Sequence, residues 1–201
     1  MVEIGLIVCK NIDNGIGYQG DLLFRLKPDM EFFKKTTLDV ENNNGMKNVV
    51  IMGYNTWKSI PNKFKPLTDR INVIITKRNY QHMMEENKIK YNNQLIISNN
   101  LIEIIDSLKL RLDVFRVFII GGQNIYKETL DNNLIDKLYI TNVLYSLSTQ
   151  FIDTYLTNIN YDKYQLSWKS IIYKDNATII PLKNKQILEY YFSIFTRNNA
   201  L

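Results

Sequence analysis

The chain is poor in the residues that form cross-links and metal centres. Among its 201 residues it has one cysteine, Cys9, which excludes an internal disulfide, and one histidine, His82. Zinc sites are built from several cysteine and histidine ligands, and a Ser-His-Asp relay needs a histidine at its centre. We interpret the polar stretch 77–93 as a loop that carries His82 on the surface. We therefore expect no metal, and we expect proton chemistry to fall to a carboxylate or to water.

Long apolar runs and a basic leader are also missing. We therefore expect no membrane span, no signal peptide and a reducing, cytoplasmic location. The net charge is +5 and the isoelectric point about 9.1, but the chain has no dense basic tract. The charge thus suits an anionic ligand, and nucleic acid is not a required partner. We expect a monomer.

Apolar patterns of two kinds alternate along the chain. Short β-branched runs, typical of strands covered on both faces, predict strands over 2–9, 48–52, 71–76, 95–98 and 116–120. Helical spacing predicts helices over 29–38, 55–60, 100–110 and 123–130. With 45% hydrophobic residues the chain can bury a full core, so we expect one domain over 1–201. The alternation predicts an α/β fold with a central, mostly parallel twisted sheet.

The last third changes character. Strand patterns over 137–143, 164–173 and 186–195 follow one another without a clear helix, which indicates an antiparallel edge. Turn-rich breaks at Asp175-Asn176 and at 183–185 are candidates for hairpin turns. Residues 156–182 are weakly patterned and leave room for an insertion, and the asparagines at 42–44 indicate a loop between elements. In total we expect about eight strands and about four helices.

A lone acid stands in an apolar setting near the N-terminus. Asp29 follows a loop with three glycines and has Leu26, Met30 and Phe33 as neighbours. Burying a carboxylate costs free energy unless a polar group pairs with it. Asp29 is therefore either a site for a ligand with donor nitrogens or a first-turn helix acid, favoured by the helix dipole after Pro28. The residue by itself leaves both interpretations open.

Two junctions of the type strand–glycine–helix suggest a phosphate site. Gly53 follows one predicted strand, with Thr56 available as a helix cap, and Gly121-Gly122 follow another. Helix N-termini attract phosphate, and the carboxyl ends of parallel strands meet at one sheet edge. We therefore expect the two junctions to lie near each other and to suit a diphosphate. Neither matches the dinucleotide fingerprint GxGxxG, and each alone is also compatible with a tight turn.

Taken in order, these pieces and others form a specific set. The chain resembles the dihydrofolate reductase family over nearly its whole length, through Gly15-Ile-Gly, Gly20-Asp-Leu, Asp29 with Phe33, the segment 51–61, Pro66-Leu-x-x-Arg70, Ile120-Gly-Gly-x-x-x-Tyr126 and Thr141. The resemblance implies that family's fold and the NADPH-dependent reduction of 7,8-dihydrofolate to tetrahydrofolate, which supports one-carbon and thymidylate metabolism. Antifolate inhibitors would bind the same site.

The resemblance also implies roles for single residues. Asp29 would bind the pterin N3 and 2-amino group and support protonation of N5, and Thr141 would fix its orientation. Arg70 would fork onto the α-carboxylate of the glutamate tail, although a surface arginine before a strand is common. Phe24 stands where the family nearly always has tryptophan, and it cannot donate a hydrogen bond. The remaining substrate contacts would be Ile7, Val8, Cys9, Met30, Phe33, Ile60, Leu67 and Ile120.

For the cofactor, the resemblance implies that the Gly121–Gly122 bond is cis. Lys77 and Arg78 would read the adenosine 2′-phosphate and favour NADPH over NADH, while Tyr54 stands where many members have lysine or arginine. The loop 11–23, in which Leu23 replaces a common proline, would be a lid over the nicotinamide. The other cofactor contacts would be Ile16, Gly17, Gly20, Gly53, Asn55, Thr56, Thr76, Gln123, Asn124, Ile125 and Tyr126.

Other classes of function stay open from the sequence. A related reductase of the same fold could act on a pyrimidine or pterin precursor, but such a substrate gives Arg70 no partner. A non-catalytic folate- or nucleotide-binding protein would not need both Asp29 and Thr141. A nucleic-acid-binding domain would need a basic stripe with interleaved aromatic residues, which we do not find. We expect no fused thymidylate synthase, because the chain ends just past the last predicted strand.

Overall fold

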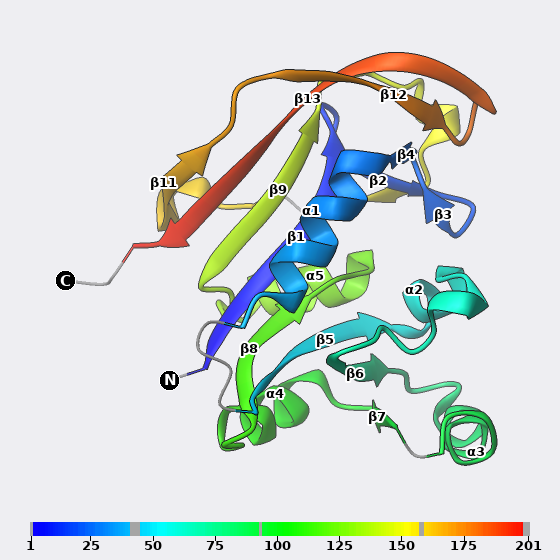
Figure 1. The fold of residues 1–201 in the computed structure, drawn as a ribbon, viewed down its shortest axis with the longest axis vertical. Coiled ribbons are helices and arrows are strands. Elements are labelled where there is room, and N and C mark those ends of the chain that lie inside the picture. The colour runs from blue at the N-terminus through cyan, green and yellow to red at the C-terminus, as the bar shows by residue number, and fades with distance from the viewer. Residues whose placement is uncertain (1, 41–44, 93, 157–158, 199–201) are drawn as a thin grey trace.

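The computed structural model describes residues 2–40, 45–92, 94–156 and 159–198, so the asparagine cluster at 42–44 lies outside it. A large mixed sheet runs through the molecule (Figure 1). Its strand order is β4-β12-β13-β9-β1-β8-β5-β6-β7, and β11 also pairs with β13. With β11 the described sheet has ten strands where about eight were expected, and the predicted α/β class is confirmed.

The middle of this sheet is parallel. Its strands are β1 (Glu3–Asn11), β5 (Lys47–Gly53), β6 (Arg70–Ile75), β7 (Leu95–Ser98), β8 (Val114–Ile119) and β9 (Lys137–Val143). β1 pairs with β8 on one side and with β9 on the other. Residues 49–52 are fully buried, as expected for a β-branched strand covered on both faces. The carboxyl ends of β5, β6 and β8 therefore lie at one edge.

The antiparallel edge predicted for the C-terminal third is confirmed. It consists of β4 (Phe24–Leu26), β11 (Tyr164–Lys169), β12 (Tyr173–Ile179) and β13 (Asn184–Arg197). The long β13 pairs with β9 on one side and with β11 and β12 on the other.

Two details of that edge differ from the prediction. The single strand expected over 164–173 is two strands with a break at 170–172. Asp175 and Asn176 lie inside β12 and form no turn, because the ladder to β13 continues through them and the Tyr190 hydroxyl donates to Asp175. The turn expected at 183–185 is present at Lys183, which has a φ of 51°, and β13 begins at the next residue.

Five α-helices are described: α1 (Lys27–Leu38), α2 (Tyr54–Ser59), α3 (Tyr80–Lys90), α4 (Leu101–Lys109) and α5 (Gln123–Asp131). Four of them were predicted. The loop expected over 77–93 is wrong, because most of it is α3, although His82 is exposed as expected. α3 has little apolar periodicity. It is held by buried Met83 and by Asn87, whose side chain bonds the backbone N–H and C=O of Leu95.

Helix α1 crosses in front of the main sheet (Figure 1). Pro28 occupies its first turn, where a missing N–H costs nothing, and Lys35 lies in its last turn. Asp29, Phe33 and Thr37 are spaced by four residues and therefore share one face. Of these, Asp29 and Thr37 are buried.

A second, three-stranded antiparallel sheet stands beside the first. It joins β2 (Gly15–Tyr18), β3 (Asp21–Leu22) and β10 (Thr154–Tyr155). Short 3₁₀ turns complete the described elements at Asn62–Phe64, Thr149–Phe151 and Tyr161–Lys163. Much of the loop 11–23, expected as a lid, is thus built into this small sheet.

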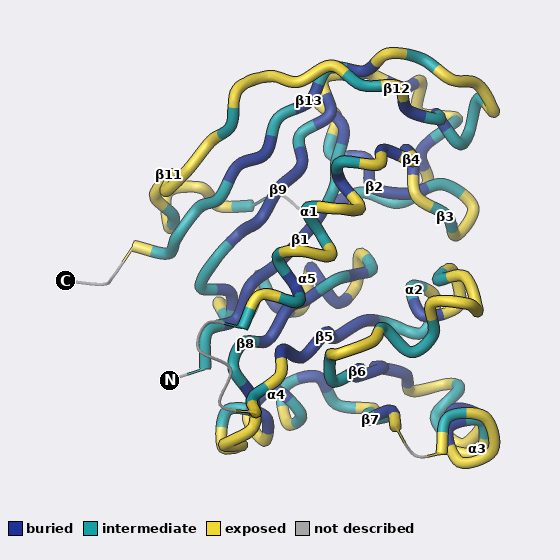
Figure 2. Tube along the Cα trace, viewed as in Figure 1, coloured by how far each residue is buried: buried dark blue, intermediate teal, exposed yellow. Residues whose placement is uncertain are grey.

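Burial follows the layers of the fold (Figure 2). The central strands are buried, whereas β11 is exposed along most of its length, with Leu166 and Trp168 each about half exposed. No described helix is both long enough and apolar enough to span a membrane. The described residues also contain no cluster of acidic, histidine and cysteine side chains suited to a metal ion.

Candidate functional site

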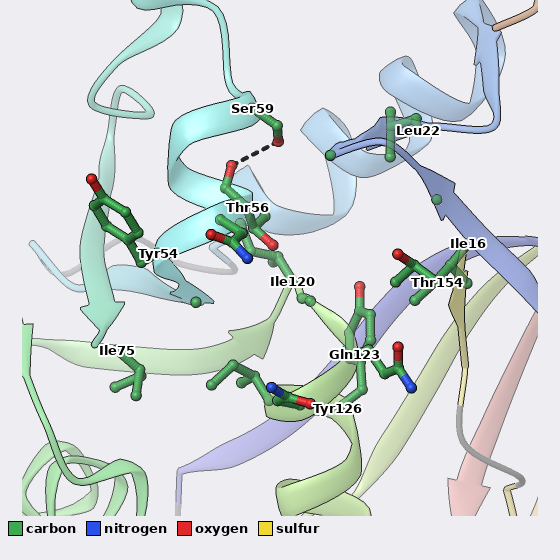
Figure 3. A pocket seen from close by; sticks show the side chains of 18 of the residues that line it. Ile16, Leu22, Tyr54, Thr56, Ser59, Ile75, Ile120, Gln123, Tyr126 and Thr154 are labelled. Atoms are coloured by element: carbon green, nitrogen blue, oxygen red, sulfur yellow. Dashed lines mark hydrogen bonds between the residues drawn. The ribbon is translucent and has the colours of Figure 1, made fainter. Parts of the chain in front are cut away.

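A cleft of about 890 Å³ opens at the carboxyl ends of β5, β6 and β8. We call it the main cleft. Around it stand Tyr54 and Thr56 of α2, Ile75 of β6, Tyr126 of α5, and Leu22 and Thr154 of the small sheet (Figure 3). Ligands of open α/β sheets bind at this edge. All sixteen residues assigned above to the cofactor line the main cleft.

The two glycine junctions contact each other, as expected. The Gly53 N–H donates to the Gly121 carbonyl at 2.8 Å. The Gly121–Gly122 peptide bond is cis, and Gly121 has a φ of 115°, which favours glycine. A Cβ on Gly122 would come within 3.2 Å of Thr56 Oγ1. Glycine at these positions therefore keeps the floor of the cleft open.

Two helices begin at these junctions. Gly53 caps α2 and Gly122 caps α5, and neither helix has a side chain that accepts from its first amides. The expectation that Thr56 caps α2 is therefore wrong: it lies inside the helix, and its hydroxyl lies beside Gly122. The uncapped amides are suited to an anionic ligand.

Basic side chains border the cleft near the end of β6. Lys77 and Arg78 are exposed and line it, and Thr76 is buried beneath them. The Thr76 hydroxyl accepts from the Asn79 N–H at 3.2 Å and so shapes the turn into α3. The Lys58 ammonium lies 5.8 Å from the centre of the Tyr54 ring, which adds a third positive charge near this part of the site.

Tyr126 closes the inner end of the cleft. It is 5% exposed, and its hydroxyl donates to the Ile7 carbonyl at 2.8 Å. Burial raises the pKa of Tyr126 well above its ordinary value, so the hydroxyl keeps its proton. This bond ties α5 to β1 beneath the cis peptide.

Asp29 lies beyond this end of the cleft. It is 6% exposed, and the Thr141 hydroxyl of β9 donates to its Oδ1 at 2.6 Å. Burial raises the pKa of Asp29 from 3.8 to about 6, although the bond from Thr141 lowers it. The carboxyl group is near enough to Cys9 and Tyr126, which both line the cleft, to raise the pKa of each. Both features considered for Asp29 are therefore present: it is an acid in the first turn of α1, and its carboxyl group is buried beside the cleft.

An apolar cluster lies next to Asp29. It contains Ile7, Phe33, Ile60, Leu67 and Ile120, all assigned above to the substrate. Val8 and Cys9 line the main cleft. Met30, expected in the same slot, is 43% exposed, because it is rotated by about 100° around the helix from Asp29. Its contact with a substrate stays a prediction.

Arg70 stands at the far side of this cluster. Its Nη1 donates to Thr37 Oγ1 at 2.7 Å and its Nε to the Thr68 carbonyl at 3.0 Å. The guanidinium lies 6.0 Å from the centre of the Phe33 ring. These contacts fix the direction of the arginine before any ligand arrives, which suits a fork for a carboxylate.

Phe24 packs into the second part of the core. It is 3% exposed, pairs with Ile179 of β12 and meets the Tyr145 ring edge-on at 6.4 Å. Cys9 packs against the same cluster and also lines the main cleft, so Phe24 adjoins the cleft through Cys9. Its effect on a reaction stays a prediction.

Several residues of the cleft were not predicted from the sequence. They are Asp21, Leu22, Ser59, Ile75, Asn79, Asp153 and Thr154. Asp21, Leu22 and Ser59 lie inside motifs that were recognised, and Asn79 directly follows Lys77-Arg78, so treating each motif as a whole would have found them. Asp153 and Thr154 gave no signal, because β10 reaches the cleft only through its pairing with β2.

Asp153 also contacts the segment 11–23, which was expected to act as a lid. Its Oδ2 accepts from the Gln19 N–H at 2.6 Å, and its own N–H donates to the Gly17 carbonyl at 3.2 Å. At the start of the segment, Asn11 Oδ1 accepts from the Gly15 N–H at 2.7 Å. The segment is thus held by side chains at its start and in its middle, and its end is held by the Ile180 N–H, which donates to the Leu23 carbonyl.

An open α/β sheet with a long cleft at its strand ends defines a class of ligand-binding domain. Comparison with known proteins identifies one family within this class. The family model described as dihydrofolate reductase matches residues 3–189. The dihydrofolate reductase of Schistosoma mansoni is 32% identical over 173 residues, which cover 81% of this chain and 82% of the relative. The chain belongs to the dihydrofolate reductase family.

Other relatives agree. The dihydrofolate reductase of Candida albicans is 46% identical over 129 residues, 64% of this chain and 62% of the relative. The bifunctional dihydrofolate reductase-thymidylate synthase of Plasmodium chabaudi is 36% identical over 148 residues, 72% of this chain. The match spans only 24% of that bifunctional protein.

Proposed function

We propose that this chain catalyses the NADPH-dependent reduction of 7,8-dihydrofolate to 5,6,7,8-tetrahydrofolate. The family to which it belongs consists of oxidoreductases that carry out this reduction with a nicotinamide cofactor. The observation that carries the proposal is the buried Asp29–Thr141 pair beside the main cleft. A carboxyl group there is suited to the flat, amidine-like edge of a pterin.

The residues of the main cleft fit the cofactor. Glycines keep the floor open where a side chain would meet Thr56, and the uncapped starts of α2 and α5 suit the diphosphate. Lys77 and Arg78 are placed to prefer a 2′-phosphate, which supports NADPH over NADH. When bound, the cofactor supplies the hydride that reduces C6 of the pterin.

The protein supplies orientation and a proton. Thr141 holds Asp29 so that its free carboxyl oxygen can accept from the pterin 2-amino group or N3. A pKa of about 6 keeps part of the carboxyl population protonated near neutral pH, which supports proton delivery toward N5. The apolar cluster around Phe33 excludes water from the reacting rings, and Arg70 binds the glutamate tail.

The direct test is loss of NADPH absorbance when purified protein is mixed with NADPH and dihydrofolate. Asp29→Asn is the control: it should still bind NADPH and should lose nearly all turnover at neutral pH. Absence of turnover by the unaltered chain under these conditions would refute the proposal. A diaminopyrimidine antifolate should raise the melting temperature of the unaltered protein.

Arg70 separates this proposal from a reductase of pyrimidine or pterin precursors. Arg70→Leu should raise KM for dihydrofolate by about tenfold or more, since it removes a charged bidentate partner. The same change should leave turnover of a pterin without a glutamate tail nearly unaltered. An equal effect on both substrates would contradict the assignment of Arg70.

We further propose that the enzyme is a single-domain monomer and that it acts in the cytoplasm. The presence of only one cysteine favours such a reducing compartment.

A further inference from the structure

Two phenylalanine rings connect α1 to the antiparallel edge of the sheet. Phe32 of α1 and Phe192 of β13 stack with centroids 4.4 Å apart and planes inclined by 29°. Phe192 is 9% exposed and Phe32 is half-buried. Stacked rings add attraction and a preferred geometry beyond the burial of their area.

The stack lies beside the hydrogen bond of the candidate acid. Phe192 is the antiparallel register partner of Thr141, so both side chains project from the same face of the sheet. Phe32 follows Asp29 by three residues, so the two are neighbours on the surface of α1. The pair Phe32–Phe192 thus runs next to the pair Asp29–Thr141, and both connect the same helix to the same region of sheet.

We propose that Phe192 is a positioning residue: by stacking on Phe32 it holds α1 at the separation from β9 at which Asp29 accepts from Thr141. The proposal rests on the function proposed above. Phe192 touches no reacting group in this arrangement. It acts through the helix that carries the acid.

Phe192 is itself fixed from its other side. Tyr190, two residues earlier on the same face of β13, meets its ring edge-on at 5.5 Å. The Tyr190 hydroxyl donates to Asp175 of β12 at 2.7 Å, and the Tyr173 ring lies 6.2 Å from Phe192. Because these contacts hold the ring from the β12 side, a substitution of Phe192 should mainly change the position of α1.

The titration of Asp29 can report this position. The titratable groups whose charge couples to it are Cys9 on β1, Tyr126 on α5 and Tyr190 on β13. Burial raises the pKa of all three, so they stay neutral in the range where Asp29 titrates. Burial is also the main cause of the raised pKa of Asp29. A helix that shifts and admits water should therefore lower it.

The test compares two leucine substitutions in the same strand. Phe192→Leu removes the stack, and Phe195→Leu removes a ring that packs against Tyr161 at 5.1 Å, away from Asp29. The pKa of Asp29 is read twice in each variant: from the pH profile of hydride transfer, and from carbon-13 resonances of the aspartate carboxyl groups, with Asp29→Asn for assignment. Phe192→Leu should lower this pKa by about 0.5 or more and slow hydride transfer by roughly tenfold.

Phe195→Leu should lower the melting temperature and leave both pKa readings where they are in the unaltered protein. Equal pKa values in the two variants would overturn the proposal. If Phe192→Leu does not fold, Phe32→Leu, at a half-buried site, provides the same comparison. Absence of turnover by the unaltered chain would refute the proposed function alone, since the carbon-13 titration needs no reaction.

Discussion

Burial of the Asp29 carboxyl group should lower the free energy of unfolding of this protein at neutral pH. The pKa of Asp29 rises from 3.8 to about 6 on folding, mainly because burial disfavours the charged carboxylate. Below pH 3.8 the group is protonated in both states and has no effect. As the pH rises toward 6 the unfolded chain ionises first, so the free energy of unfolding falls, and above pH 6 the loss is constant. At roughly 1.4 kcal/mol per tenfold change in proton affinity, the loss reaches about 3 kcal/mol at pH 7.

Asp29→Asn removes this loss. The amide oxygen can still accept from Thr141, and no charge has to be buried. At pH 7 the variant should therefore be inactive but more stable by up to about 3 kcal/mol, which corresponds to roughly 6 to 12 °C in melting temperature for a chain of this size. Near pH 4 the difference should nearly vanish.

Denaturant unfolding of both proteins between pH 4 and pH 8 measures the effect. Glu31→Gln is a suitable control, since its side chain is 67% exposed on the same helix and its change should be small at every pH. The reasoning is refuted if Asp29→Asn is no more stable than the unaltered protein at pH 7, or if its advantage does not depend on pH.

Three further predictions concern the cofactor-binding residues, Phe24 and the segment expected to act as a lid. Replacing Lys77 and Arg78 together by alanine should raise KM for NADPH by about tenfold and change KM for NADH little. If steady-state kinetics show that both KM values change equally, the two residues do not recognise the 2′-phosphate. Phe24→Trp should speed hydride transfer by about two- to fivefold, because an indole N–H adds one donor, and an unchanged single-turnover rate would reject this. Asp153→Ala removes the acceptor of the Gln19 N–H and should slow hydride transfer by about two- to tenfold, the range one hydrogen bond supports. Equal single-turnover rates would show that the lid does not need Asp153.

The parts of the fold with strong local patterns could be predicted from the sequence. The parallel strands are continuous β-branched runs, and α4 has apolar residues at regular helical spacing. α3 was missed because its stability comes from tertiary contacts, chiefly the side chain of Asn87 on the backbone of Leu95. The division of 164–173 into β11 and β12 was missed for a related reason: both pair with β13, and no local residue marks the break.

The site was predictable to a similar degree. The glycine junctions were visible in the sequence, because Gly121 needs a positive φ and a Cβ on Gly53 or Gly122 would crowd Ile125 or Thr56. The rest followed from the family resemblance. Residue-level orientation was harder. Met30 directly follows Asp29 in the helix, yet the rotation by one residue turns its side chain toward solvent. The contribution of β10 to the cleft depends on pairing between segments far apart in sequence, which no local pattern encodes.

The position of β13 has a consequence for how the protein is made. This strand is hydrogen-bonded to β9, β11 and β12, and it carries the ring that packs on α1. A ribosome delivers Asp29 early, Thr141 much later and residues 184–197 later still. During synthesis α1 can therefore pack early against β5, through the bonds from Asn48 to the Thr37 and Asp39 carbonyls, whereas Phe32 has no ring to stack on until β13 emerges.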